Sequence, residues 1–177
     1  MKQDLKTKSK YLSLILRHNP DAGGIKLDEN GWANIKDLIH HSGFTLKELE
    51  TIVQNDDKQR YTFDDYKQKI RANQGHSIAD VKIEFDEVVP PEFLYHGTVQ
   101  KFIGSIMKNG LSKQKRNYLH LSGDITTATT VGSRRGNAVI LKIAALEMHN
   151  DGYKFFISKN GVYLIDLIPS KYITIEY

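Results

Sequence analysis

The pattern of apolar residues changes near residues 80–91, and this change constrains the fold most. Before it, apolar residues recur mainly at helical spacing. After it, short apolar runs are separated by turn sequences such as Asn150-Asp151-Gly152. Helical spacing predicts helices, and short runs between turns predict strands. We therefore expect two lobes, residues 1–80 and residues 81–177, in a protein of the α+β class.

The first lobe is predicted to be mainly helical, with a strand hairpin at its end. The first helix ends at Asn19-Pro20, because a residue before proline avoids the helical region. Asn34 can cap the second helix, and Thr45 with Glu48 can form a capping box for the third. Extended segments are expected to begin at Trp32 and to cover residues 60–63 and 68–71. This order of elements is typical of a winged-helix domain.

The second lobe is predicted to be rich in strands. A helix at residues 99–109 is followed by Gly110, which suits the position after a helix. Ser122 can cap a second helix over residues 124–131. The expected strands cover residues 93–96, 118–121, 139–143, 153–157, 162–168 and 172–175. Few helices and many short strands imply an antiparallel-rich sheet.

Residue content excludes several kinds of site. The chain has no cysteine, so it forms no disulfide, thiolate metal site, cysteine nucleophile or iron–sulfur centre. The glycine-rich loops of Rossmann and P-loop proteins are absent, as are zinc-protease and serine-hydrolase motifs. His40-His41 has no partner at ligand spacing, so we expect no metal site.

Hydropathy and the start of the chain indicate the compartment. No apolar run approaches the roughly 18 residues that a membrane span requires. The lysine-rich residues 1–10 are not followed by the apolar segment of a secretory signal. We therefore expect a cytoplasmic protein that has no membrane partner. We also expect a monomer, a prediction that does not rest on these two features.

Positive charge is concentrated in one segment. The whole chain carries a net charge of +4. Residues 101–142 alone hold eight basic side chains and one acidic side chain, a balance of +7, whereas residues 84–92 hold four acids and no base. A concentrated basic segment suits a polyanion such as nucleic acid or a dinucleotide. A solvated basic face is the alternative.

Three short segments place histidine or arginine where an anion could bind. Arg17-His18 lies at the end of the first helix. The helix dipole favours cations at this end, and arginine also binds phosphate well. Tyr95-His96-Gly97-Thr98 ends a strand, and its glycine would let a ligand approach the backbone closely. His120-Leu121-Ser122 is a second strand end with a histidine, followed by the arginine turn Gly132–Gly136. Each segment alone is also compatible with an ordinary polar turn.

An ordered set of short strings, from about Ser9 to Ile173, is more specific than any one of them. The set resembles the NAD-dependent RNA 2′-phosphotransferase family of the KptA type, known from tRNA splicing. The strings are Leu16-Arg17-His18-Asn19-Pro20, Asn30-Gly31-Trp32, Asn55–Tyr61, Ile70–Ser77, Tyr95-His96-Gly97-Thr98, His120-Leu121-Ser122, Val131–Gly136 and Asn160–Leu164.

The resemblance implies a fold and a reaction. Residues 1–80 would form a winged-helix RNA-binding lobe, and residues 81–177 an NAD-binding lobe of the ADP-ribosyltransferase type, with the active site between them. The internal 2′-phosphate of RNA would attack the nicotinamide ribose of NAD and expel nicotinamide. The ribose 2-hydroxyl would then attack phosphorus, which gives RNA with a 2′-hydroxyl and ADP-ribose 1″,2″-cyclic phosphate.

The resemblance also implies catalytic residues. The family's Arg-His-Arg-Arg set corresponds to Arg17, His18, Arg60 and Arg116 in this sequence. Arg17 would bind RNA phosphate, and the other three would hold the 2′-phosphate. Arg71 stands in an equally distinctive string, so it is an alternative to Arg60 as the third catalytic residue, or it binds substrate. Arg134 is likewise an alternative to Arg116 as the fourth.

Cofactor-binding residues are implied at three strand ends. The Gly97 backbone would bind the nicotinamide carboxamide, with His96 and Thr98 at the ribose or adenosine side. His120 and Ser122 would complete the pocket, and Arg134 would hold the NAD phosphates. At the third strand end, Val162 stands where protein-modifying relatives have glutamate, which suits a substrate that brings its own nucleophile.

Two alternative functions remain open from the sequence. An enzyme with the same NAD pocket could stop after the first step and ADP-ribosylate phosphorylated nucleic-acid ends. A winged-helix nucleic-acid binder with a degenerate second lobe is a non-enzymatic alternative. The intact strings at residues 95–98 and 120–122 argue against this binder.

Overall fold

The structure is a computed structural model that describes residues 2–176. The chain divides into two compact units between Glu84 and Phe85, slightly beyond the expected boundary at residue 80. The residues after 80 stay with the first unit because they contact it. Val81 is buried and lies against Gly31, and the Lys82 N–H donates to the Glu29 carbonyl at 2.7 Å.

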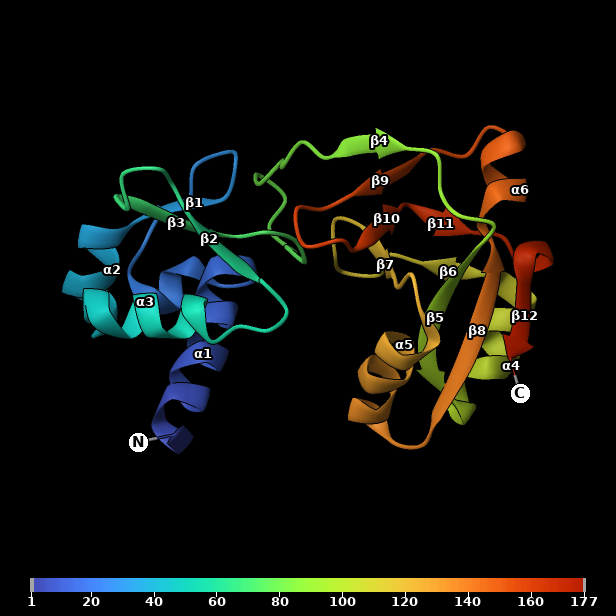
Figure 1. Ribbon diagram of the computed structural model, residues 1–177, viewed down its shortest axis with the longest axis horizontal. Coiled ribbons are helices and arrows are strands. Elements are labelled where there is room, and N and C mark those ends of the chain that lie inside the picture. Colours follow the sequence, from blue (N-terminus) through green and yellow to red (C-terminus); the bar gives the residue numbers. More distant parts are fainter. Residues whose placement is uncertain (1, 177) are drawn as a thin grey trace. The chain divides into compact units, whose positions relative to one another are not determined.

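The first unit combines three α-helices with one small sheet (Figure 1). Its strands are antiparallel in the order β1-β3-β2. The predicted helices, the extended segment at Trp32 and the hairpin are confirmed. The elements are α1 (Lys2–Arg17), the 3₁₀ turn η1 (Pro20–Gly23), β1 (Trp32–Asn34), α2 (Ile35–Ser42), α3 (Leu46–Gln54), β2 (Tyr61–Phe63) and β3 (Lys69–Ala72).

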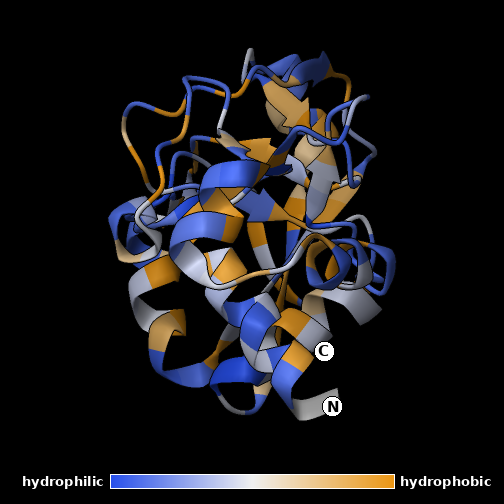
Figure 2. Ribbon diagram, turned by 90° about the vertical axis from the view of Figure 1, so that its left-hand side faces the viewer, coloured by the Kyte–Doolittle hydropathy of each residue, from blue (hydrophilic) through white to orange (hydrophobic). Residues whose placement is uncertain are grey.

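Local capping explains where α2 and α3 begin. The Asn34 side chain accepts a hydrogen bond from the Lys36 N–H at 2.8 Å, as the sequence predicts. Thr45 and Glu48 form the predicted capping box, with N···O distances of 3.2 and 2.9 Å. Behind these ends the helices bury apolar side chains, Ile35 and Leu38 in α2 and Leu49 and Ile52 in α3. Figure 2 shows hydrophobic and hydrophilic residues interleaved along the helices that face the viewer. The buried core includes Leu12, Ile15, Leu16, Leu38, Leu49 and Ile70.

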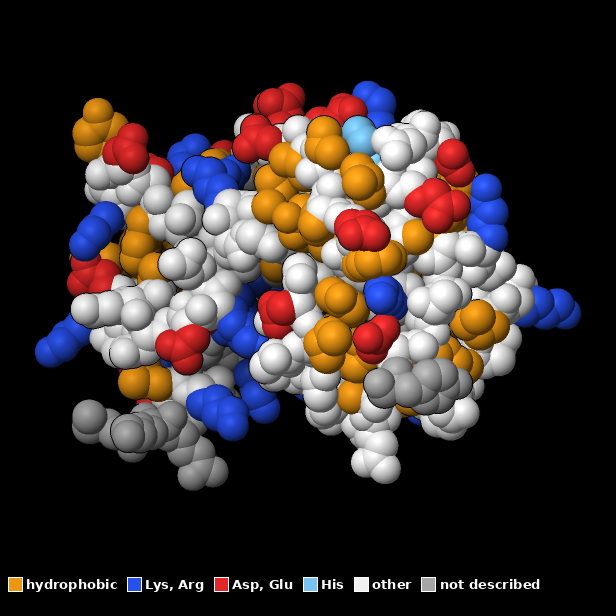
Figure 3. Space-filling view, turned by 45° about the vertical axis from the view of Figure 1, so that its right-hand side comes forward, with side chains coloured by type: hydrophobic (Ala, Val, Ile, Leu, Met, Phe, Trp, Pro, Cys, Tyr) orange, Lys and Arg blue, Asp and Glu red, His pale blue; other side chains and the backbone are white. Residues whose placement is uncertain are grey.

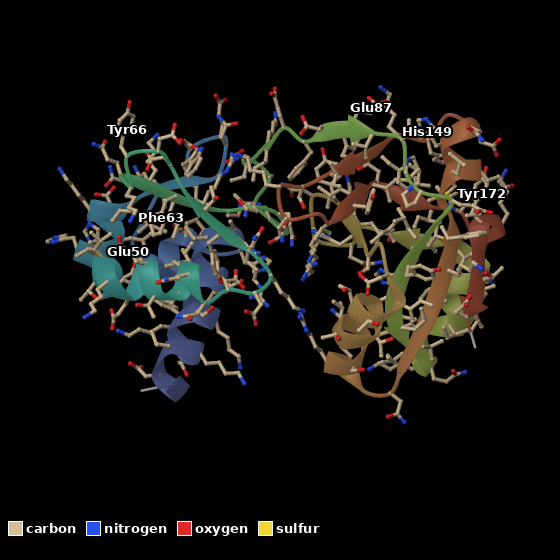
Figure 4. The ribbon with its side chains drawn as sticks, viewed as in Figure 1. Glu50, Phe63, Tyr66, Glu87, His149 and Tyr172 are labelled. Carbon is tan, nitrogen blue, oxygen red and sulfur yellow. The ribbon has the colours of Figure 1, made fainter. Side chains whose placement is uncertain are left out.

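The hairpin of β2 and β3 ends in an exposed turn. Tyr66 at this turn is 84% exposed and projects outward in Figure 4. The turn is held to α3 by an ion pair between Lys67 and Glu50 at 2.7 Å. The Asp64 carboxylate also accepts hydrogen bonds from the N–H groups of Gln68 and Lys69. The aromatic side chain is therefore presented to solvent on a fixed turn.

The second unit contains several small antiparallel sheets covered by short helices. The main sheets have the orders β4-β9-β10-β7 and β12-β8-β5, and β6 pairs with β11. Its elements are β4 (Asp86–Val88), β5 (Phe93–Val99), α4 (Gln100–Asn109), β6 (Leu111–Ser112), β7 (Leu119–Leu121), α5 (Ile125–Gly132), η2 (Ser133–Arg135), β8 (Ala138–Ala144), α6 (Ala145–Asn150), β9 (Phe155–Ile157), β10 (Tyr163–Ile165), β11 (Leu167–Ile168), η3 (Ser170–Tyr172) and β12 (Ile173–Glu176).

The cap of α5 differs from the prediction. Asp124, not Ser122, caps the helix: its carboxylate accepts hydrogen bonds from the N–H and the hydroxyl of Thr127 at 2.7 and 2.8 Å. Ser122 is still in extended backbone, because its N–H and C=O pair with Tyr95. The expected cap was wrong because this partner lies far away in the sequence.

Two further differences arise in the apolar segments. The run expected as one strand over residues 162–168 splits into β10 and β11, which pair with β7 and β6 respectively. The short helix α6 was not predicted, because it follows β8 directly and has no side-chain cap to mark its start. Its Met148 is fully buried in the core. The Tyr172 hydroxyl, near the right-hand edge of Figure 4, donates to Asp151 at the end of α6.

The surface of the second unit mixes residue types. On the face drawn in Figure 3, hydrophobic side chains are interrupted by acidic and basic ones. Exposed apolar side chains include Val89 and Leu167. Within residues 2–176, no helix combines the length and the apolar character needed to cross a membrane.

Candidate active site

In the first unit, the end of α1 is held by the loop of residues 73–77. The Ser77 N–H donates to the Arg17 carbonyl at 2.9 Å, and the Ser77 hydroxyl lies 2.9 Å from His18 Nδ1. Gly75 has a φ of +91° and lies against the Arg17 guanidinium, which a Cβ at this position would meet at 3.6 Å. The Arg17 guanidinium also lies 5.9 Å from the ring centroid of Tyr61. The predicted pair Arg17-His18 is thus fixed from several sides.

Arg60 is anchored by a buried carboxylate. Asp56 is 8% exposed and forms an ion pair with the Arg60 guanidinium. The other Asp56 oxygen accepts the Arg60 N–H at 2.5 Å. The side chain of Arg60 remains about one-third exposed, at 32%. One nitrogen of the Arg60 guanidinium is therefore paired with Asp56, and part of the side chain remains open to solvent.

Arg71, the competitor of Arg60, has a different environment. Its guanidinium lies over the Trp32 ring, 4.5 Å from the centroid, and donates to the Asn30 carbonyl at 3.3 Å. Partial burial lowers the pKa of Arg71, and the nearby Asp28 opposes this effect. Both arginines are positioned side chains, so their geometry does not select one over the other.

His76 is a residue of this cluster to which the sequence assigned no role. It is 3% exposed, and its pKa is lowered to about 4, mainly by burial and then by the charges of Arg17, His18 and Arg71. A hydrogen bond to the Leu16 carbonyl opposes this shift. His76 is therefore neutral at physiological pH. The string Ile70–Ser77 pointed to this segment, but not to a buried imidazole between cations.

In the second unit, His96, His120 and Arg116 form a second cluster. His96 Nδ1 donates to the His120 carbonyl at 3.1 Å. The Arg116 guanidinium lies 3.4 Å from His120 Nδ1, which accepts because a guanidinium can only donate. Burial lowers the pKa of His96; the hydrogen bond to His120 opposes this, and Arg135 and Arg116 lower the pKa further. The structure thus brings these predicted residues together.

The edge of β5 beside this cluster carries backbone groups suited to a ligand. Tyr95 exchanges two backbone hydrogen bonds with Ser122, at 2.9 and 2.8 Å. Directions alternate along an antiparallel strand, so the N–H and C=O of Gly97 point to the same edge as those of Tyr95, away from β8. Gly97 thus presents one donor and one acceptor, and Ser122 marks where this edge begins.

Gly97 is required for a reason that the sequence did not indicate. A Cβ on Gly97 would lie 1.9 Å from the Ala128 carbonyl oxygen and 2.8 Å from the Gly132 nitrogen. The backbone of α5 therefore packs directly on β5, and only glycine fits there. The close approach to Gly97 is thus made by α5, which packs on one face of β5. The N–H and C=O of Gly97 lie at the edge of the strand and not on this face. Thr98, the next residue, is buried at 7% exposure.

The arginines of the second unit lack carboxylate partners. Among residues 2–176, the ion pairs of this unit involve lysines, and none involves Arg116, Arg134 or Arg135. Desolvation lowers the pKa of Arg116, followed by the charges of Arg135 and then Arg134. Arg135, which lies in the predicted arginine turn but was not assigned as a site residue, therefore acts on both Arg116 and His96. The signal that could have found it is the second arginine in the turn after α5.

The third strand end also adjoins this cluster. Val162 directly precedes β10, and its N–H and C=O bond to Ser158 at 3.1 and 3.0 Å. Leu164 of β10 stands opposite His120 of β7.

Within residues 2–176, no group of three or more His, Asp or Glu side chains is arranged to hold a metal ion. His40 and His41 contact each other edge-to-face on α2.

Known proteins match nearly the whole chain. A family model described as "RNA 2′-phosphotransferase, Tpt1 / KptA family" matches residues 2–167. A Flavobacterium johnsoniae protein named "Probable RNA 2′-phosphotransferase" is 49% identical over 173 residues, 95% of this chain and 94% of the relative. Proteins with the same name from Nostoc punctiforme and Fusobacterium nucleatum are 49% and 48% identical. They cover 93% and 98% of this chain, and 93% and 99% of their own lengths.

Proposed function

The chain belongs to the Tpt1/KptA family of RNA 2′-phosphotransferases and is an enzyme of this class, and we propose that it transfers an internal RNA 2′-phosphate to NAD. A 2′-phosphate oxygen attacks the anomeric carbon of the nicotinamide ribose, and nicotinamide leaves. The ribose 2-hydroxyl then attacks phosphorus, its proton is lost, and the RNA 2′-oxygen leaves as a hydroxyl. The other product is ADP-ribose 1″,2″-cyclic phosphate, and the RNA is of the tRNA splice-junction type.

One observation carries this proposal: the arginines of the second unit have no carboxylate partner and lie by a hydrogen-bonding strand edge. A 2′-phosphate and the NAD pyrophosphate are both anions, so they repel each other unless fixed cations lie between them. Arg116, Arg134 and Arg135 supply such charge without an internal counter-ion. Preorganised cations of this kind stabilise charge in phosphoryl transfer.

The residues of the second unit also fit NAD itself. The nicotinamide carboxamide offers a donor and an acceptor, which match the C=O and N–H of Gly97. His96 and Thr98 would face the ribose or adenosine side, and His120 and Ser122 would complete the pocket. Arg134 would hold the NAD phosphates, and Arg135 extends this set because its charge acts on the same histidine. NAD supplies the ribose carbon that accepts the phosphate.

The proposed catalytic residues are those that the family resemblance implies. Arg17 binds an RNA phosphate, while His18, Arg60 and Arg116 hold the transferred phosphate and the charge that develops on it. The His18 imidazole can also serve as a proton donor or acceptor. Arg71, stacked on Trp32, binds an RNA phosphate near the reacting one. Arg60 keeps the role that the family resemblance assigns to it, and the buried Asp56 would hold its guanidinium in place.

The proposed lobe identities follow from the element order. A sheet ordered β1-β3-β2, with α2 and α3 between its first two strands in the sequence, supports a winged-helix lobe for RNA. Two antiparallel sheets linked at the bridge of Tyr95 and Ser122 support an NAD lobe of the ADP-ribosyltransferase type.

The test uses NAD and an oligoribonucleotide with one internal 2′-phosphate. We expect release of nicotinamide, loss of the 2′-phosphate and formation of the cyclic phosphate in equal amounts. The same oligonucleotide without the 2′-phosphate is the control and should release no nicotinamide. Failure to release nicotinamide from the phosphorylated RNA would refute the proposal. Stable ADP-ribosylated RNA without cyclic phosphate would instead identify an enzyme that stops after the first step.

A further inference from the structure

We propose that Ser77 is a positioning residue that sets the orientation of the His18 imidazole. This inference rests on the proposed function, because it concerns the catalytic group of the first unit. Ser77 lies at the end of the loop of residues 73–77, which packs against the end of α1. Its role is distinct from substrate binding, since it acts through His18.

Two contacts from the same residue fix the geometry. The Ser77 N–H donates to the Arg17 carbonyl at 2.9 Å, which places the Ser77 backbone directly beside the turn that carries His18. The Ser77 hydroxyl then lies 2.9 Å from His18 Nδ1. The His18 side chain itself is exposed. Water could satisfy the nitrogens of an exposed imidazole, so folding does not require the hydrogen bond from Ser77. A ring that is nevertheless held in one direction suits contact with a substrate.

The hydroxyl suits both protonation states of the imidazole. A serine hydroxyl can donate to Nδ1 of the neutral ring and accept from Nδ1–H of the charged ring. Ser77 can therefore hold the ring while a proton enters or leaves through Nε2, on the opposite side of the ring. A carboxylate in this place would add a negative charge near a phosphate, whereas a hydroxyl adds none.

The same loop also fixes Arg60, which links two proposed catalytic residues. The Asn73 N–H donates to the Arg60 carbonyl at 2.8 Å, and the Asn73 side-chain amide donates to the Gln59 carbonyl at 2.6 Å. Asn73 is buried, and Gln59 adopts a φ of +44°. One short segment thus holds the backbone of Arg60 at its start and the side chain of His18 at its end.

The test compares Ser77→Ala with Ser77→Thr under saturating NAD and 2′-phosphorylated RNA. We expect Ser77→Ala to lower turnover about 10-fold, as loss of a residue that orients a functional histidine does elsewhere, with the KM for NAD unchanged. Ser77→Thr keeps the hydroxyl and should retain most of the turnover. The matched control is Ser42→Ala, which removes a hydroxyl that donates to the Gly23 carbonyl at 2.6 Å in the same unit. It should leave turnover unchanged.

A double-mutant cycle tests whether Ser77 acts through His18. In a His18→Ala background, Ser77→Ala should cause no further loss of turnover. An additive loss in that background, or unchanged turnover of Ser77→Ala alone, would overturn the inference. Equal losses in Ser77→Ala and Ser77→Thr would do the same. No turnover by the unaltered protein would instead refute the proposed function, and this inference with it.

Discussion

Each unit holds an imidazole among arginines, buried in the first unit and half-buried in the second, but the arginines differ in their carboxylate partners. In each, a histidine donates to a backbone carbonyl and has its pKa lowered chiefly by burial: His76 in the first unit and His96 in the second. In the first unit, Arg60 is paired with Asp56 and Arg71 is stacked on Trp32. In the second, among the described residues, Arg116, Arg134 and Arg135 have no carboxylate partner.

This difference separates two ways of binding an anion. A carboxylate partner within the fold fixes the direction of an arginine side chain, but it also neutralises part of its charge. Cations without such partners repel one another, and an anionic ligand relieves this repulsion. In the first unit the pair with Asp56 fixes Arg60, whereas the arginines of the second unit keep charge that an anionic ligand could neutralise.

The largest expected effect is on Arg116, the cation that contacts His120. Arg116→Ala should lower the rate of phosphate transfer at least about 100-fold, because a preorganised donor toward developing charge is lost. NAD binding should persist, since the side chain would face the nucleophile. Single-turnover transfer from 2′-phosphorylated RNA, together with calorimetric NAD binding, measures both quantities.

The control for Arg116 is its neighbour Lys115, an exposed cation in the same basic segment. Lys115→Ala removes the same formal charge and should leave transfer almost unchanged. Equal losses in the two variants would mean that only the total charge of the segment matters. Unchanged transfer by Arg116→Ala would move the catalytic role to Arg134 or Arg135.

The next largest effect concerns the buried His76 of the first unit. Its pKa is about 4 in the folded chain, against about 6.5 when unfolded. Between these values the unfolded chain binds the proton and the folded chain does not, so the free energy of unfolding falls as the pH falls. The loss should reach about 3 kcal/mol near pH 4 and then level off.

Urea unfolding of the whole chain from pH 7 to pH 4 measures this loss. His76→Gln keeps an N–H that can donate to the Leu16 carbonyl but does not titrate, so it should reduce the pH dependence. His96 shifts in the same direction, and some pH dependence should therefore remain in the variant. An unchanged pH dependence in His76→Gln would show that His76 does not carry the effect.

Asp56 tests whether the cations of the first unit are held by internal partners. Asp56→Ala removes the acceptor of the Arg60 N–H and the partner of its guanidinium. We expect the free energy of unfolding to fall by about 2 kcal/mol, because a buried N–H loses its partner. Arg134→Ala, in contrast, should change it by less than about 0.5 kcal/mol. Similar losses in both variants would remove the contrast between the units.

Features set by neighbouring residues were predictable, and features set by distant ones were not. Asn34, Thr45 and Glu48 act within four residues of a helix start, so the sequence predicts their caps correctly. Ser122 failed as a cap because Tyr95 already pairs with its backbone. The helix α6 was not predicted, because apolar residues continue from β8 and no capping residue marks its start.

The candidate site follows the same division. The strings around Arg17 and His96 identified the segments that bear chemistry, and the structure groups their side chains within each unit. The roles of Asn73, His76 and Ser77 arise from contacts with residues distant in the sequence. Asp56 is an exception, because it pairs with Arg60 only four residues away and was still not identified from the sequence. Gly97 was assigned to ligand approach, whereas the missing side chain makes room for the Ala128 carbonyl of α5.

The smallest expected effect separates the two arginines of the turn after α5. Both are exposed, so loss of either should raise the KM for NAD only a few-fold, about 5-fold at most. Arg134→Ala should do so with little change in turnover at saturating NAD. Arg135→Ala should have the larger effect, because Arg135 is the stronger influence on His96 and Arg116. Steady-state kinetics with varied NAD measures this order, and salt should weaken both effects. A loss confined to turnover at saturating NAD would place these side chains at the reacting phosphate, and the charge of the second unit would then serve catalysis and not cofactor binding.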